Sequence, residues 1–351
     1  MRPIFALYLG LLAASAGLGC SRESVGSMHG YVAIAMDGEE SLNLLMVDLS
    51  GRQVDTGLSC SPGGCSRMVW APDGTKIVLY GPPHCVLDTS TLECTTHLAP
   101  YQFVQWSQDS THALFVDPDS NMLYRAVIDG SERQDIIEVS QLETVSPDEA
   151  YAVDWRCPEG QHDCDYWDRT PELLDLRTAE RRAYPCVAPV IGCSNVDMPM
   201  VKTKYWFSDN RTVLVTETYR CTTSSWMVWT CNVETGETEK VVDADYDKAP
   251  TVEISDFPVS PDERWLAFPD GIKNGTGFTV VDLKNGFSTH FVELPHLHGV
   301  LDFTYDSRYL VVYGQEKTYA FDLAKQKLID LPLSNDLVIS LSPVWVELPS
   351  P

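Results

Sequence analysis

The chain has 351 residues, of which 44% are hydrophobic, so it can form a sizeable core and is not a disordered chain. It carries 50 Asp and Glu against 25 Lys and Arg, which gives a formal net charge of -25. This charge repels phosphate backbones and therefore argues against a nucleic-acid partner, while it fits a soluble exported surface.

The first 19 residues have the layout of a secretory signal peptide, with one Arg, an apolar stretch and then small residues. Ala14-Ser15-Ala16 fits an ordinary signal-peptidase site. Gly17-Leu18-Gly19-Cys20 instead resembles the lipobox of bacterial lipoproteins, in which the cysteine becomes the lipidated first residue; Gly17 departs from the usual aliphatic residue. There are 11 cysteines, and removal of Cys20 leaves the even number expected of an oxidised, exported chain.

We therefore favour lipidation at Cys20. Ser21 does not match the Asp that resembles an inner-membrane retention signal, so the expected location is the outer membrane, facing the periplasm or the cell surface. If Cys20 is not lipidated, we expect a secreted protein. Residues 20–27 then form a short N-terminal linker. The membrane is expected to be a partner only through this anchor.

A tight-turn motif recurs along the rest of the chain. In the stretch from Met68 to Gly81, MVWAPDGTKIVLYG, Asp-Gly separates two apolar runs, which predicts a β-hairpin. Related turns, each followed by an apolar run, begin at Trp106, Val145, Phe207, Val259 and Thr304. Their Ser-Pro-Asp aspartates are interpreted as turn formers and not as general acids.

A second hairpin element lies between these turns and occurs seven times. Each copy reads as a strand, an Asp or Asn with a polar turn, and another strand, so the full repeat predicts four short antiparallel strands. The copies span residues 44–54, 85–95, 123–134, 173–183, 230–241, 279–289 and 319–329. Four strands in a repeat of about 35 to 60 residues are typical of a β-propeller. The predicted fold class is therefore all-β.

We expect one propeller domain over residues 28–348, most simply with seven four-stranded blades. The first blade lacks its innermost strand, and the tail 336–348 supplies one strand, so the two ends of the chain should share a blade and close the ring. Six or eight blades are alternatives.

The W-S-P-D-G repeats resemble those of the TolB-type, WD-repeat-like propellers of bacterial envelopes. The resemblance covers about residues 28 to 348. It implies a propeller fold, whereas propellers host many functions. The chain is not expected to carry the extra N-terminal domain of TolB, so the resemblance does not imply a Tol-Pal role.

The longer connections are predicted to lie on one face of the ring, because they fall in b–c loops and in crossings between blades. Insertions on one face of a repeat protein usually mark its binding face. Aromatic side chains in or beside these loops could serve as interface anchors, although each could instead pack between blades. The candidates are Trp155, Tyr166, Trp167, Trp226 and Trp229.

The ten remaining cysteines pair most simply in sequence order, although sequence does not prove connectivity. Such short disulfide loops would mainly stiffen the loops of the elaborated face. The expected pairs are Cys60 with Cys65, Cys85 with Cys94, Cys157 with Cys164, Cys186 with Cys193, and Cys221 with Cys231.

No enzyme motif identifies a catalytic residue, and no cofactor is predicted. The chain has no Gly-x-Ser-x-Gly elbow, no P-loop and no Gly-x-Gly-x-x-Gly. His162, His296 and His298 are weak metal-ligand candidates. Residues 117–121 resemble the start of a calcium loop but lack its Gly and its bidentate Glu, so a b–c turn fits better.

The leading functional hypothesis is a scaffold that binds an envelope protein or peptide through its stiffened, aromatic face. The alternative is a hydrolase or lyase that acts on a small molecule or glycan at the mouth of the central channel, with or without a metal. Such sites converge from several blades, so no sequence spacing reveals them. The sequence leaves the oligomeric state open.

Overall fold

The computed structural model describes residues 31–36, 42–48, 53–60, 67–80, 85–95, 102–128, 131–158, 161, 164, 169–186, 200–220, 224–245, 257–269, 277–294, 296–314, 317–331 and 337–341. The described residues form 27 β-strands arranged in small antiparallel sheets. The all-β prediction is confirmed. Within these residues there is no helix long and apolar enough to cross a membrane.

Six of the sheets have four strands and one has three. The first comprises β1 (Tyr31–Met36), β2 (Leu42–Asp48), β3 (Gln53–Cys60) and β27 (Leu337–Leu341). The second comprises β4 (Arg67–Trp70), β5 (Lys76–Tyr80), β6 (Cys85–Asp88) and β7 (Cys94–Thr95), and the third β8 (Gln102–Trp106), β9 (His112–Asp117), β10 (Met122–Val127) and β11 (Gln134–Glu138). The fourth comprises β12 (Leu142–Val145), β13 (Tyr151–Arg156), β14 (Thr170–Asp175) and β15 (Arg181–Ala183), and the fifth β16 (Met200–Trp206), β17 (Thr212–Arg220), β18 (Ser224–Asn232) and β19 (Thr238–Asp245). The three-stranded sheet comprises β20 (Trp265–Pro269), β21 (Gly277–Asp282) and β22 (Ser288–Glu293), and the last sheet β23 (Leu297–Phe303), β24 (Tyr309–Gly314), β25 (Thr318–Asp322) and β26 (Lys327–Asp330).

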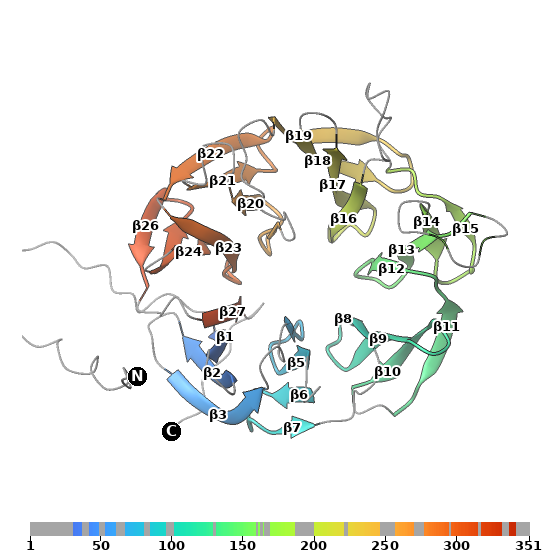
Figure 1. Cartoon of the computed structure of the whole chain (residues 1–351), viewed down its shortest axis with the longest axis horizontal. Coiled ribbons are helices and arrows are strands. Elements are labelled where there is room, and N and C mark those ends of the chain that lie inside the picture. The colour runs from blue at the N-terminus through green and yellow to red at the C-terminus, as the bar shows by residue number, and fades with distance from the viewer. Residues whose placement is uncertain are drawn as a thin grey trace, which may run out of the picture.

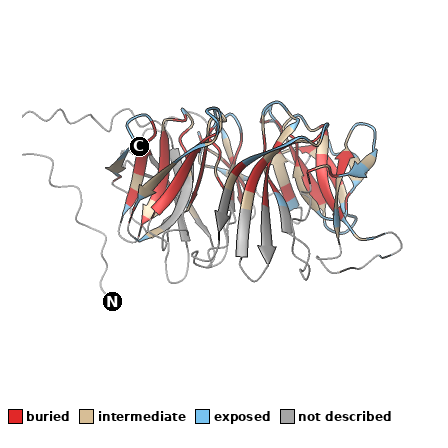
Figure 2. Ribbon diagram, turned by 90° about the horizontal axis from the view of Figure 1, so that it is seen from above, coloured by how far each residue is buried: buried red, intermediate tan, exposed pale blue. Residues whose placement is uncertain are grey.

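The sheets stand around a central axis as the blades of a propeller (Figure 1). The first strand of each repeat, such as β8, β12 and β16, lies innermost, and the last lies at the rim (Figure 1). Seen from the side, the ring is a flat disc in which buried residues occupy the middle of the blades and exposed residues occur in loops along one edge (Figure 2). The predicted β-propeller is confirmed.

The ring closes as expected, because the C-terminal strand pairs with the N-terminal one. β27 runs antiparallel to β1 with Val32 opposite Leu341 and Met36 opposite Leu337. β27 also contacts β23 on one side and β4 on the other. The chain ends therefore share a blade, and the innermost position of that blade is held by β27.

The prediction of seven four-stranded blades is wrong. The described residues form six four-stranded blades, and the β20–β22 sheet has three strands. At the innermost place of that sheet, residues 257–259 make an isolated bridge between Val259 and Leu266. Ala267 N donates to Pro258 O at 3.1 Å, but no strand is formed there among the described residues. Pro258 cannot donate to a ladder because it has no N–H, which limits the pairing at this point.

The hairpin predicted from Met68 to Gly81 forms between β4 and β5, with Trp70 opposite Ile77. Gly74 takes a φ of 70°, which a glycine adopts without steric cost. Asp73 Oδ1 accepts the Thr75 N–H at 2.9 Å, so the aspartate acts as a turn former as predicted.

The same turn position is filled by residues other than glycine in the later repeats. These residues also have positive φ, which costs an L residue about 1 kcal/mol or more. They are Ser110, Glu149, Asn210, Glu263 and Ser307, with φ values of 58°, 56°, 59°, 56° and 56°.

Four of these side chains reach back to the turn of the preceding repeat. The Asp73 N–H donates to Ser110 Oγ at 3.0 Å, and the Asp262 N–H donates to Ser307 Oγ at 2.9 Å. The bond from the Asp148 N–H to Asn210 Oδ1, at 3.1 Å, links another pair of turns. Glu263 accepts both the N–H and the hydroxyl of Ser208. These turns therefore join neighbouring blades as well as neighbouring strands.

The hydrophobic core lies between successive blades. Each cluster combines side chains from two adjacent sheets, as is expected when both faces of a blade are covered. Phe278 and Phe321, from neighbouring sheets, make an edge contact with ring centroids 5.4 Å apart. Packing between blades thus fixes the innermost strands around the axis.

Candidate functional site at the central channel

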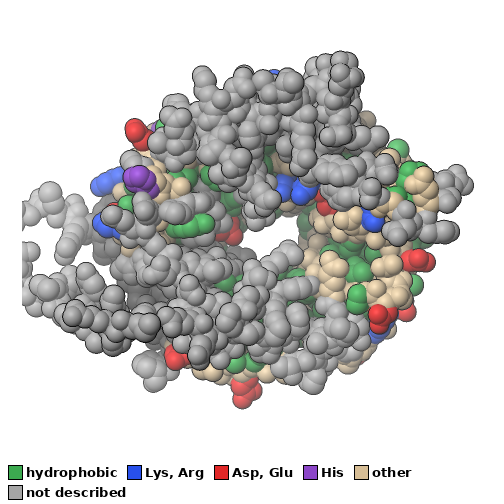
Figure 3. Space-filling view, viewed as in Figure 1, with side chains coloured by type: hydrophobic (Ala, Val, Ile, Leu, Met, Phe, Trp, Pro, Cys, Tyr) green, Lys and Arg blue, Asp and Glu red, His purple; other side chains and the backbone are tan. Residues whose placement is uncertain are grey.

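The ring encloses an open channel, and the innermost strands form its wall. Figure 3 shows the opening from one face, with basic and acidic side chains at its edge. β12 contacts both β8 and β16, so these three strands lie side by side on the wall. Channel mouths of this kind are frequent ligand sites because several blades converge there.

A β-bulge recurs in four of the innermost strands, always at the same place in the repeat. In β12 the pairing register shifts between Leu142 and Thr144, which leaves Glu143 as the extra residue. The corresponding extra residues in β8, β16 and β23 are Val104, Lys204 and Leu301. Bulges redirect side chains, and they are over-represented beside active sites.

Glu143 joins the β12–β15 blade to the β16–β19 blade at the channel wall. Its Oε2 accepts Trp155 Nε1–H at 2.9 Å, and its Oε1 accepts the Thr203 N–H at 3.0 Å. Burial raises the pKa of Glu143 to about 7, although both hydrogen bonds and the charges of Lys202 and Lys204 oppose this shift. The carboxyl group can therefore change its protonation state near neutral pH.

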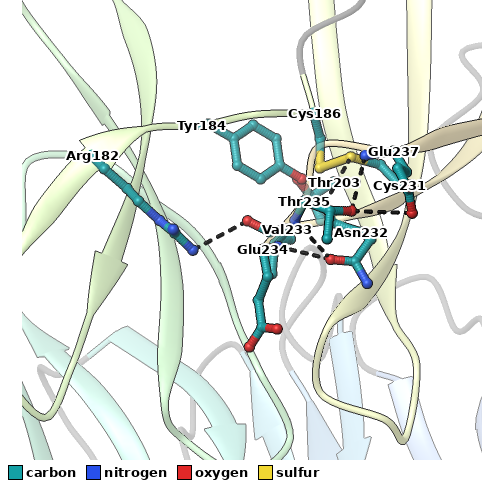
Figure 4. The surroundings of a disulfide bond; sticks show 10 residues. All are labelled: Arg182, Tyr184, Cys186, Thr203, Cys231, Asn232, Val233, Glu234, Thr235 and Glu237. Carbon is teal, nitrogen blue, oxygen red and sulfur yellow. Dashed lines mark hydrogen bonds between the residues drawn. A yellow bond between two sulfur atoms is a disulfide. The ribbon is translucent and has the colours of Figure 1, made fainter.

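Three further contacts hold the same pair of blades together. The Tyr184 hydroxyl lies 2.9 Å from Thr203 Oγ1. Cys186 and Cys231 form a disulfide across the blades, with 5.7 Å between their Cα atoms. Figure 4 shows this disulfide beside Tyr184 and Thr203, and the bond from Arg182 to Val233 O at 3.2 Å.

Asp302, Tyr205 and Glu263 form a second polar group, which comes from three successive sheets. Burial raises the pKa of Asp302 to about 7, while its hydrogen bond from the Phe303 N–H, at 2.7 Å, opposes the shift. Burial first, and then the negative charges of Glu263 and Asp302, raise the pKa of Tyr205 to about 12. The three side chains are partly exposed. This group therefore combines a carboxyl that titrates near neutrality with a phenol that stays protonated.

Two of the five aromatic residues predicted for the binding face are buried in the core instead. Trp155 and Trp229 are 7% and 5% exposed and belong to the core cluster between β12–β15 and β16–β19. They pack between blades because each lies within a strand that both neighbouring sheets cover. Trp226 is in β18, but its side chain lies outside the described residues, as do Tyr166 and Trp167.

The disulfide pairing is confirmed in part. Cys85–Cys94 and Cys157–Cys164 form as expected. Cys186 pairs with Cys231 and not with Cys193, so the expected Cys186–Cys193 and Cys221–Cys231 bonds are wrong. Sequence order fails here because blades that are neighbours in space bring together cysteines 45 residues apart. Cys193, Cys221, Cys65 and the side chain of Cys60 lie outside the described residues.

The remaining predicted sites are largely outside the described part of the chain. This applies to Cys20, to His162 and to the side chain of His298. His296 is exposed and has a φ of 61°. Among the described residues no group of three His, Cys, Asp or Glu side chains is placed to hold a metal. Residues 117–121 form the predicted turn, here between β9 and β10.

Glu143, Tyr205 and Asp302 were missed by the sequence reasoning. Each stands one or two residues before the turn motif of its repeat, at positions occupied by Val104 and Gln105 in another repeat. Alignment of the repeats on their turns would have marked these polar residues. These polar residues are visible in the sequence, but they indicate a site only when it is known that this position of the repeat faces the central axis.

The structure resembles solved β-propellers at low sequence identity. Oligogalacturonate lyase in complex with manganese has a TM-score of 0.55 and 15% identity, over 83% of each chain. The dihydro-heme d1 dehydrogenase NirN in complex with DHE has a TM-score of 0.51 and 12% identity, over 88% of this chain and 74% of that one. TolB from Acinetobacter baumannii has a TM-score of 0.43 and 13% identity; the match covers 76% of this chain and 64%, less than two thirds, of TolB.

These similarities bear on the fold alone. TolB proteins are among the β-propellers that the structure resembles. No protein-family model and no curated protein sequence matches the chain. The three disulfides indicate an oxidising, extracytoplasmic compartment.

Proposed function

We propose that this protein binds a small polar molecule at the mouth of its central channel and acts on it as a hydrolase or lyase. The observation that carries the proposal is the polar group of Asp302, Tyr205 and Glu263, which three successive sheets bring together with Asp302 on the channel strand β23. Two solved structures with TM-scores above 0.5 are an oligogalacturonate lyase and a dihydro-heme d1 dehydrogenase, and their likeness supports only the fold.

Asp302 suits acid–base chemistry because a group with a pKa near the working pH can both take up and release a proton. Among the described residues, the Phe303 N–H donates a hydrogen bond to Asp302 Oδ1 at 2.7 Å. Tyr205 stays protonated at neutral pH and can donate a hydrogen bond to a ligand oxygen. In this assignment Asp302 transfers the proton, while Tyr205 and Glu263 orient the ligand.

A thermal-unfolding screen tests this proposal. The protein from residue 21 onward is heated with small sugars, oligosaccharides and sugar acids, with and without a divalent cation. A ligand at 100 times its Kd stabilises the native state by about 2.7 kcal/mol. The matched control is Asp330→Asn, since Asp330 is an exposed carboxylate that pairs with Lys317 at 2.6 Å on the outer strand β26.

The proposal expects a compound that raises the Tm of the native protein and of Asp330→Asn but not that of Asp302→Asn. Turnover of that compound should be lost in Asp302→Asn as well. A compound that stabilises all three proteins equally binds elsewhere, and a screen without any stabilising compound counts against a channel site.

A second candidate function is the protein- or peptide-binding scaffold. It is favoured by the Cys157–Cys164 disulfide, which closes a loop within the connection between β13 and β14. A stiffened loop binds a partner with a smaller ordering cost. Trp167 remains the proposed anchor in that connection, and Trp226 the second anchor.

An envelope pull-down separates this candidate from the channel site. The native protein is compared with the Trp167→Ala, Trp226→Ala double variant by quantitative mass spectrometry. A partner captured by the native protein and by Asp302→Asn, but lost by the double variant, supports the scaffold. If the double variant captures the same proteins as the native one, the aromatic face is not the binding surface.

We also propose that the protein is an outer-membrane lipoprotein anchored at Cys20. The extracytoplasmic disulfides support export, and the lipobox resemblance supports the anchor. Metabolic labelling with radioactive palmitate should mark the native protein and not the Cys20→Ala variant. Equal absence of label in both would leave cleavage after Ala16 and secretion as the better account.

A further inference from the structure

Two arginines, Arg156 and Arg169, stand at the two ends of the connection between β13 and β14, which contains the Cys157–Cys164 loop. Arg156 is the last residue of β13, and Arg169 directly precedes β14. Arg156 is opposite Thr170, the first residue of β14, so both arginines lie at the same end of the blade. Arg156 is exposed and Arg169 is partly exposed. A partner that meets this end of the blade can therefore contact both side chains.

Both guanidinium groups are held by neutral side chains in the crossing that leads to β12. Arg156 Nε donates to Ser140 Oγ at 3.3 Å, and Arg169 Nη1 donates to Gln141 Oε1 at 2.8 Å. Among the described residues neither of these arginines forms an ion pair. The chain has 50 acidic residues against 25 basic ones, so most cations could find a carboxylate. These two keep positive charges that no carboxylate of the described residues pairs with.

The buried carboxylate of Asp154 fixes the backbone that carries the two neutral side chains. Asp154 is 0% exposed, and its Oδ1 accepts the N–H of Ser140 at 3.0 Å and that of Gln141 at 2.8 Å. Its Oδ2 accepts Arg181 Nη1 at 2.7 Å, which balances the charge of Asp154. The crossing is thus anchored from inside the blade, and its side chains orient the two arginines in the absence of a ligand. Such preorganisation lowers the ordering cost of binding.

We propose that Arg156 and Arg169 form a binding site for the carboxylate groups of an acidic peptide segment. Arginine presents its N–H donors in a planar fork that matches a carboxylate, and arginine clusters are a recurring means of binding acidic motifs. The inference names the class of partner for the scaffold candidate above and rests on that candidate, not on the channel site.

The charge of the whole chain favours a peptide over a membrane or a nucleic acid. A net charge of -25 repels a surface that carries many phosphates. A short peptide brings only a few carboxylates, and at physiological ionic strength these interact mainly with charges within about 8 Å. Two arginines without carboxylate partners can therefore dominate the field that such a peptide meets.

Selection from a random peptide library displayed on phage tests the site. The protein from residue 21 onward serves as bait, and the Asp and Glu content of the bound peptides is compared with that of the input library. The arginine site predicts enrichment of Asp and Glu. An acidic surface without such a site would instead attract peptides rich in Lys and Arg. The two outcomes thus differ in sign.

The double variant Arg156→Gln, Arg169→Gln should lose this enrichment. Its matched control is Arg177→Gln, Arg211→Gln, which removes two charges from side chains that are 68% and 60% exposed in turns at the other end of the blades. The control should select acidic peptides as the native protein does. For one selected peptide, fluorescence anisotropy should show a Kd roughly tenfold higher for each of Arg156 and Arg169 replaced, because a hydrogen bond to a charged group is lost each time.

The site is overturned if the native protein does not enrich acidic peptides, or if Arg156→Gln, Arg169→Gln enriches them equally. Peptides that are selected without acidic enrichment and lost in the Trp167→Ala, Trp226→Ala variant would keep the scaffold and reject the arginine site. A selection that yields no peptide at all counts against both. Should the double arginine variant fail to fold, the two single variants decide, since each should still weaken binding about tenfold.

Discussion

The backbone N–H of Asp73 donates to the hydroxyl of Ser110 at 3.0 Å, although the two residues stand 37 positions apart. Both occupy the turn between the first two strands of their repeats. Ser110 accepts a positive φ of 58° and places its side chain against the preceding turn, whereas Gly74, at the same position in its own repeat, has no side chain to offer. A residue that sequence reasoning interprets as part of a local turn is thus also a contact between blades.

Replacement of Ser110 by Ala should destabilise the protein, because it leaves the Asp73 N–H without its acceptor while the positive φ remains. We expect a loss of about 1 kcal/mol in the free energy of unfolding. Ser307→Ala should behave alike, since Ser307 accepts the Asp262 N–H at 2.9 Å. Chemical denaturation measures both losses.

Gly at these positions separates the two effects. Ser110→Gly also removes the acceptor, but it relieves the positive φ, so it should cost less than Ser110→Ala. If the Gly variant is the less stable of the two, relief of the backbone conformation is not the dominant difference.

The Cys186–Cys231 bond should stabilise the fold more than Cys157–Cys164, because it closes a longer loop. The two pairs are 45 and 7 residues apart. In the chain-entropy model a disulfide of the longer kind contributes roughly 4 kcal/mol and one of the shorter kind roughly 2 to 3 kcal/mol. Replacement of each pair by Ala, followed by thermal unfolding, gives the comparison; a larger loss for Cys157–Cys164 would contradict it.

The fold could be predicted from the sequence because it depends on local turn and strand signals. Asp73 and Gly74 form the predicted turn, and the apolar runs beside them become β4 and β5. It also predicted ring closure, since the first repeat has one strand too few and the tail one too many. The fourth strand that was predicted for the β20–β22 sheet does not form among the described residues, because Pro258 interrupts a ladder that the apolar pattern alone predicts.

The candidate site could not be predicted from the sequence, because it depends on contacts between repeats. Cys186 is closer in sequence to Cys193 than to Cys231, yet the packing of two blades decides its partner. Trp155 is of a residue type that often anchors interfaces, but its indole N–H donates to Glu143 Oε2 inside the ring wall. Patterns within one repeat carry no information on either relationship.

The buried ion pair of Asp154 and Arg181 gives a test of polar burial in the blade that carries Glu143. Asp154 is 0% exposed, and it accepts Arg181 Nη1 at 2.7 Å and the N–H of Gln141 at 2.8 Å. Asp154→Ala should cost about 3 to 5 kcal/mol, because the cation and the backbone donors lose their acceptor together. Urea unfolding measures this loss.

Arg181→Gln is the matched control for that variant. It leaves Asp154 with its backbone donors and keeps a polar side chain at the partly exposed position 181. It should therefore cost less than Asp154→Ala. Equal losses would mean that the ion pair, and not the backbone donors, accounts for the stability.

Asp302 should make the stability of the protein fall as the pH rises through the acidic range. Its pKa is raised to about 7 in the folded state from an ordinary 3.8, so between these values the folded protein binds more protons than the unfolded chain. Stability rises with pH only where the unfolded state binds more protons, so here the contribution of Asp302 declines from about pH 4 to pH 7 and is constant above.

Asp302→Asn keeps the shape of the neutral acid and removes this dependence. The variant should consequently gain stability relative to the native protein as the pH is raised, which urea unfolding at pH 5 and pH 8 measures. If the difference between the two proteins is the same at both pH values, Asp302 does not titrate in this range, and its role in channel chemistry loses its basis.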